Sequence, residues 1–80
     1  MNTNNEVRLH SDIEFICSIL LKFEKGEECP KEYLVEALGA KLYSDIGSKV
    51  SSAISRCRYK YGAVYKTTAK SIRHLTDEEN

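Results

Sequence analysis

The feature that most constrains the fold is a change in the spacing of apolar residues at Gly62. Before it, apolar residues recur every three to four positions, the spacing of one buried helix face. These residues are Val50, Ala53, Ile54, Cys57 and Tyr61. After it, residues 63–75 are rich in β-branched and aromatic side chains and come to alternate apolar with polar ones, as strands do. We therefore predict a helix over 47–61 that Gly62 ends, followed by a β-hairpin within 63–75.

The N-terminal half predicts two more helices. Ser11 and Glu14 have the spacing of a capping box, and the helical pattern that follows predicts a helix over 11–25 that Gly26 ends. Pro30 suits the first turn of a second helix, over 30–39. We expect residues 1–10 to be a flexible segment with at most a short strand at 7–9. Residues 77–80 are expected to form a frayed acidic tail.

These elements predict one domain over 11–76, of the α+β class and mainly α. Three helices followed by a hairpin give the element order of a three-helix winged helix-turn-helix, with the hairpin as the C-terminal wing. A chain of 80 residues can bury only a thin core. The residues expected in it are Ile16, Leu20, Phe23, Leu34, Leu38, Val50, Ile54, Cys57 and Ile72.

Charge is unevenly distributed along a chain whose formal net charge is zero. Residues 1–45 hold five Lys/Arg and nine Asp/Glu, whereas residues 46–76 hold seven Lys/Arg and no Asp/Glu. Attraction to phosphate depends on local rather than total charge. The basic C-terminal half therefore favours double-stranded DNA as the partner.

The third predicted helix reads Val-Ser-Ser-Ala-Ile-Ser-Arg-Cys-Arg-Tyr-Lys-Tyr-Gly over 50–62. It resembles the recognition helix of OmpR-type response-regulator DNA-binding domains, V-x-x-x-I-x-R-L-R-x-K-L-G. The matches are Val50, Ile54, Arg56, Arg58, Lys60 and Gly62, with Cys57 and Tyr61 in the leucine positions. The likeness extends loosely over 11–75. It implies that Arg56 contacts bases or phosphate and Lys60 contacts phosphate.

The chain also departs from that family. Ten leading residues cannot form its four-stranded N-terminal sheet, and Thr68-Ala69-Lys70-Ser71 does not match its Gly-x-Gly-Tyr wing turn. We also expect no receiver domain. The resemblance therefore implies the winged helix shape and the use of the third helix, but not phospho-signalling.

Together these features predict a sequence-specific DNA-binding transcriptional regulator with helix 47–61 in the major groove. The expected DNA contacts are Lys49, Ser52, Arg56, Arg58, Tyr59, Lys60, Lys66, Lys70 and Arg73. Lys49, Ser52, Arg56 and Lys60 would form one strip along the groove, and no carboxylate within 46–76 is available to neutralise it. Because one small module offers little interface, we expect a homodimer or binding to adjacent sites.

A second hypothesis is a small winged-helix protein-interaction module, such as a phage-type inhibitor or adaptor, whose acidic first half contacts a protein partner. An enzyme is not predicted, because neither a triad spacing nor a glycine-rich phosphate loop is found. No small-molecule substrate is expected.

Cys17, Cys29 and Cys57 are odd in number and form no CxxC pair, which favours free thiols over a zinc site or another cofactor. His74 is expected on a strand surface. The chain has neither an apolar run of membrane-spanning length nor an apolar signal-peptide core, which predicts a cytoplasmic protein of bacterial or phage type.

Overall fold

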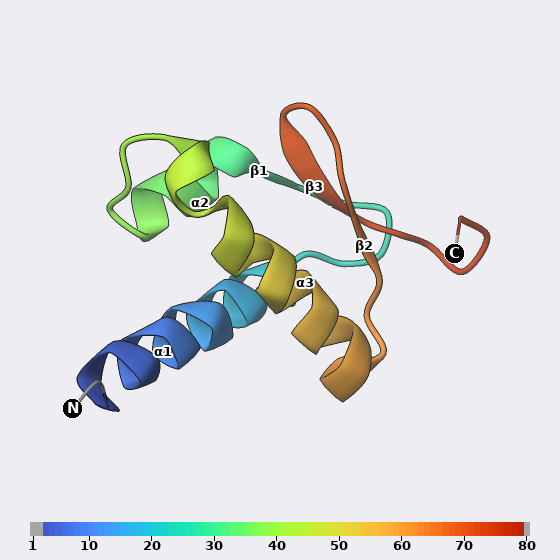
Figure 1. Ribbon diagram of the computed structural model, residues 1–80. Helices are drawn as coiled ribbons and strands as arrows, with labels where there is room; N and C mark the ends of the chain where they lie inside the picture. Colours follow the sequence, from blue (N-terminus) through green and yellow to red (C-terminus); the bar gives the residue numbers. More distant parts are fainter. Residues whose placement is uncertain (1–2, 80) are drawn as a thin grey trace.

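The computed structural model describes the backbone of residues 3–79 and the side chains of residues 11–79. The elements, in chain order, are α1 (Thr3–Leu20), β1 (Glu28–Pro30), α2 (Lys31–Ala37), the 3-10 turn η1 (Tyr43–Asp45), α3 (Gly47–Tyr61), β2 (Tyr65–Thr67) and β3 (Ser71–His74). Both β1 and β2 pair antiparallel with β3, so the sheet has the order β1-β3-β2 (Figure 1). The predicted class, α+β and mainly α with a C-terminal hairpin after three helices, is confirmed.

The helix α3 has the predicted bounds, 47–61. It ends at Gly62, whose φ of 67° lies in the left-handed region and whose N–H donates to the carbonyl of Arg58 at 3.2 Å. The hairpin also lies within the predicted residues. Its turn is fixed by Thr68, whose hydroxyl oxygen accepts the backbone N–H of Ser71 at 3.0 Å.

The bounds predicted for the first helix are wrong at both ends. α1 begins at Thr3, so the helix continues where a loose segment or a strand was expected. Because Ser11 lies inside α1, Glu14 is not used in a capping box.

The stop predicted at Gly26 is wrong because α1 already ends at Leu20, after which tighter turns follow. The N–H of Gly26 donates to the carbonyl of His74 at 2.7 Å. At Gly26 the backbone is therefore hydrogen-bonded to β3 and not to a preceding turn of helix.

The strand β1 was not predicted, and it changes where α2 begins. Glu28, Cys29 and Pro30 pair with Arg73, Ile72 and Ser71 of β3. Pro30 has extended backbone, φ −61° and ψ 139°, and precedes α2 rather than starting it. A strand of three residues is too short to show alternation, so only its partner strand defines it.

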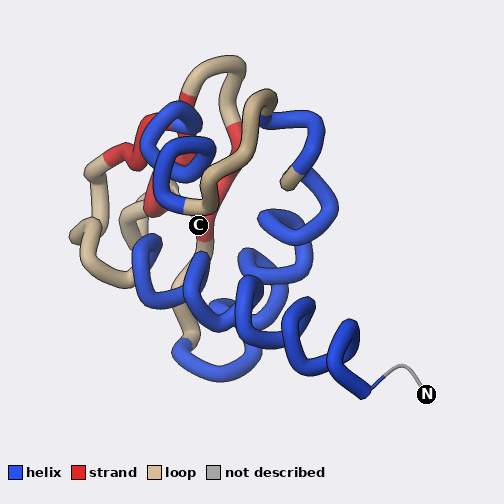
Figure 2. Tube along the Cα trace, turned by 90° about the vertical axis from the view of Figure 1, so that its left-hand side faces the viewer, coloured by secondary structure: helices blue, strands red, loops and turns tan. Residues whose placement is uncertain are grey.

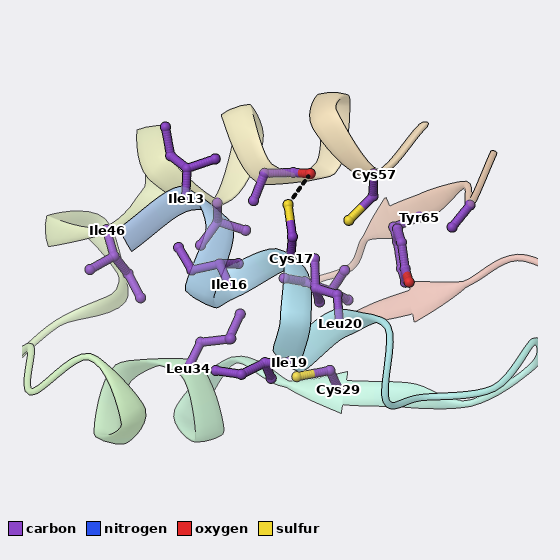
Figure 3. Packing of buried hydrophobic residues seen from close by; sticks show 14 residues of the cluster. Ile13, Ile16, Cys17, Ile19, Leu20, Cys29, Leu34, Ile46, Cys57 and Tyr65 are labelled. Carbon is purple, nitrogen blue, oxygen red and sulfur yellow. Dashed lines mark hydrogen bonds between the residues drawn. The ribbon is translucent and has the colours of Figure 1, made fainter. Parts of the chain in front are cut away.

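The core lies between α1, α3 and the inner face of the sheet. Figure 3 shows Ile16, Cys17 and Leu20 of α1 between Cys57 of α3 on one side and Leu34 of α2 on the other. Six of the nine predicted core residues are buried, and Phe23, Leu38 and Ile54 pack against them half-buried. Tyr61, which was predicted on the buried face of α3, is instead 52% exposed at the last residue of the helix. All three cysteines are free and buried. In the turned view of Figure 2 the strands gather on one side of the molecule, and the N-terminal end of α1 extends away from them.

Candidate nucleic-acid interface

One flank of α3 faces α1 and is held there by ion pairs. Lys49 Nζ lies 2.7 Å from Asp12 Oδ2. Arg56 Nη1 donates to Glu14 Oε1 at 2.5 Å, and Lys60 Nζ lies 3.6 Å from the same oxygen. The Lys49 and Arg56 side chains are only 31% and 28% exposed. Three of the predicted DNA contacts therefore already have carboxylate partners.

Glu14 is charged at neutral pH. The hydrogen bond from Arg56, together with the nearby charge of Lys60, lowers the pKa of the Glu14 carboxyl below its ordinary value. The expectation that the basic half lacks carboxylate partners is therefore wrong, because the partners come from α1, 37 or more positions earlier in the chain. The predicted strip is not one free face either, since three of its four side chains are paired with carboxylates of α1.

The outward face of α3 lies opposite the buried stripe and carries small hydroxyl side chains together with Arg58 and Tyr59. Ser51, Ser52 and Ser55 are exposed, and Tyr59 is 92% exposed. Ser55, Arg58 and Tyr59 line a shallow hollow. Arg58 forms no ion pair with any carboxylate of the described chain. This face therefore offers an available guanidinium and a flat aromatic ring among side chains that permit close approach.

The turn of the hairpin is anchored at the start of α2 (Figure 1). The backbone N–H of Lys31 donates to the carbonyl of Lys70 at 3.0 Å, and its ammonium donates to the carbonyl of Ala69 at 3.4 Å. The same ammonium lies 4.5 Å from the centre of the Tyr43 ring. Lys66 and Lys70 have exposed side chains and form no ion pair among the residues the structure describes. The two wing lysines therefore add positive charge to a turn that is held in place.

Arg73 is the one predicted wing contact that is already engaged. Its Nε and Nη2 donate to the two carboxylate oxygens of Glu79 at 2.9 and 3.1 Å, and its Nη1 donates to the carbonyl of Gly26 at 2.9 Å. Glu28 pairs with Arg73 across the sheet, and its Oε2 lies 3.6 Å from Arg73 Nη1. The hydrogen bonds from Arg73, together with the backbone N–H of Thr76, lower the pKa of Glu79 to about 2. Arg73 therefore holds the C-terminal turn against the sheet.

The expectation of a frayed acidic tail is wrong for residues 77–79. Asp77 pairs with Lys25 at 2.7 Å, and Glu79 accepts the backbone N–H of Thr76 at 3.1 Å. Lys25 lies in the loop before β1, whereas Thr76 and Glu79 lie in the turn after β3, and the fold brings that loop and this turn together. Asn80 lies outside the described residues.

His74 was expected on a strand surface, but it is 8% exposed. Its Nδ1 lies 2.8 Å from the carbonyl oxygen of Phe23, and its ring lies 4.6 Å, centre to centre, from that of Tyr65. The alternation of β3 contains the signal for this burial, because His74 follows core residue Ile72 by two positions and so shares its face.

The described residues contain no metal site and no membrane-spanning helix, and burial raises the pKa of two of their thiols. No group of three His, Cys, Asp or Glu side chains there is arranged to hold a metal ion. Burial raises the pKa of Cys29 to about 11 and that of Cys57 to about 12, so both thiols are protonated at neutral pH. No helix in this part of the chain is both long and apolar enough to cross a membrane.

Comparison with models of known protein families finds no match, and comparisons with curated proteins and with solved structures find none either. The fold defines the class, a mainly helical α+β domain with a C-terminal hairpin. The arrangement of side chains on α3 and the hairpin must therefore carry any functional argument.

Proposed function

We propose that the chain binds double-stranded DNA, with the outward face of α3 in the major groove and the hairpin turn beside it, and that it regulates transcription in the cytoplasm. The observation that carries the proposal is this face itself. It combines exposed serines with Arg58 and Tyr59, and Arg58 has no carboxylate partner within the described chain.

The dimensions and chemistry of α3 fit a groove. A helix fits the major groove of B-form DNA, and serine side chains keep its surface slim there. Ser51, Ser55 and Arg58 follow one another at spacings of four and three, so they share a line on the helix surface. The serine hydroxyls can donate to phosphate or base edges, while Arg58 can donate two hydrogen bonds to one guanine.

The proposal assigns base contact to Arg58 rather than to Arg56. The resemblance to response-regulator domains implied Arg56 as the contacting arginine. Arg56 instead donates to Glu14 and is 28% exposed, whereas Arg58 lies on the outward face. Lys66 and Lys70 supply phosphate contacts from the hairpin in this arrangement.

The test begins with selection of bound sequences from a random duplex pool, followed by affinity measurements on the selected and scrambled duplexes. We expect Arg58→Ala to weaken binding to the selected duplex by about 1–3 kcal/mol, roughly 5- to 150-fold, and to weaken binding to scrambled duplex less. Arg58→Lys keeps the charge but loses the two-pronged donor, so it should lose discrimination and retain scrambled-duplex binding.

Lys22→Ala is the matched control, because Lys22 is an exposed cation that follows α1 and belongs to neither the outward face of α3 nor the hairpin. It should alter both affinities little, and circular dichroism should show that all variants are folded. Equal losses on both duplexes would make Arg58 a phosphate contact. No duplex binding even at low salt would overturn the proposal and favour the protein-interaction module.

A further inference from the structure

Glu14 connects the first helix to the helix proposed to enter the groove. Its Oε1 accepts a hydrogen bond from Arg56 at 2.5 Å and lies 3.6 Å from the ammonium of Lys60. The Glu14 side chain is 42% exposed and that of Lys60 is 59% exposed. One carboxylate at the surface therefore holds two cations of α3.

Both cations lie next to the outward face. Arg56 follows Ser52 by four positions and precedes Tyr59 by three, so it neighbours both on the helix surface. Lys60 follows Arg56 by four and continues the same line. If the outward face lies in a groove, this line borders the side toward α1, where the phosphates of one DNA strand would lie.

We propose that Glu14 limits the affinity of the chain for DNA, because its carboxylate competes with DNA phosphate for Arg56 and Lys60. The inference rests on the proposed function. A carboxylate and a phosphate oxygen accept the same hydrogen bonds from a guanidinium and an ammonium. While Glu14 holds the two side chains, fewer cations neutralise phosphate and fewer counterions leave the DNA. Glu14 therefore limits sequence-independent binding and leaves the base contacts of Arg58 unaffected.

The experiment measures binding to random-sequence duplex over a range of salt concentrations for wild type and Glu14→Gln. Glutamine keeps the size of the side chain but removes its charge. Each freed cation adds about 0.9 to the salt slope, so the slope should steepen by about 1–2. We expect about tenfold tighter binding near 0.1 M salt. Glu14→Ala, which removes the acceptor altogether, should behave in the same way.

Glu36→Gln is the matched control, because Glu36 is exposed on α2 and forms no ion pair within the described chain. It removes one negative charge without releasing a cation of α3, so the salt slope should not change. The decisive comparison repeats Glu14→Gln in a chain that also carries Arg56→Ala and Lys60→Ala. The gain should disappear there, because the side chains that Glu14 restrains are gone.

The outcomes separate this inference from the proposed function. A gain that persists without Arg56 and Lys60 would be an effect of net charge and would overturn the role of Glu14. Wild-type binding with an unchanged slope in both Glu14 variants would overturn the inference alone. If neither wild type nor the variants bind any duplex, the proposed function fails and the inference fails with it.

Discussion

Tyr65 places a hydroxyl in the core without a hydrogen-bond partner. The residue is 7% exposed, and its Oη is buried with no partner among the described residues. Burial also raises the pKa of its phenol above the ordinary value. We therefore predict that Tyr65→Phe stabilises the protein, because it removes a polar group that folding takes out of water uncompensated.

The expected gain follows from what phenylalanine keeps and what it loses. The ring remains to pack on His74, whose centre lies 4.6 Å away at an interplanar angle of 33°. An unsatisfied buried donor or acceptor costs about 1–3 kcal/mol, and we expect about 1 kcal/mol to be recovered. For a domain of this size that corresponds to a rise in Tm of roughly 4–8 °C.

Urea unfolding followed by circular dichroism measures the free energy of unfolding of wild type and Tyr65→Phe. Tyr61→Phe is the control, because it makes the same change at a residue that is 52% exposed. It should change stability by less than about 0.5 kcal/mol. A loss of stability in Tyr65→Phe would refute the reasoning, since it would mean that the hydroxyl is paired in the folded protein.

Two further predictions concern the hairpin and the buried thiols. Lys66→Ala and Lys70→Ala should each lower the salt slope of duplex binding by roughly one and weaken all duplexes about equally; an unchanged slope in both variants would remove the hairpin from the interface. Because burial raises the pKa of Cys29 from 9.0 to about 11 and that of Cys57 to about 12, the unfolded chain loses these protons first. Their contribution to the free energy of unfolding is complete below pH 9.0 and is lost as the pH rises toward the raised values. Urea unfolding should therefore give a free energy of unfolding that falls from about pH 9 to about pH 11, and falls less steeply in Cys29→Ala.

The sequence by itself determined the elements that depend on local spacing. The bounds of α3 follow from one apolar stripe and from Gly62, which adopts the left-handed conformation that ends the helix. The hairpin follows from the change of period after that glycine. Most core residues were also predictable, because apolar side chains at a regular spacing form the face of a helix that packs inward. Tyr61 at the end of α3 has the same spacing and is 52% exposed, so spacing alone did not decide its burial.

Only the tertiary structure decided which charges remain available. Arg56 and Glu14 lie 42 positions apart, and nothing in the local pattern of either helix predicts that they meet. The strand β1 likewise exists because β3 lies beside it, and Arg73 is engaged because the C-terminal turn folds back over the sheet. Helix periodicity is set by neighbouring residues, whereas ion pairs and short strands depend on which surfaces the buried core brings together.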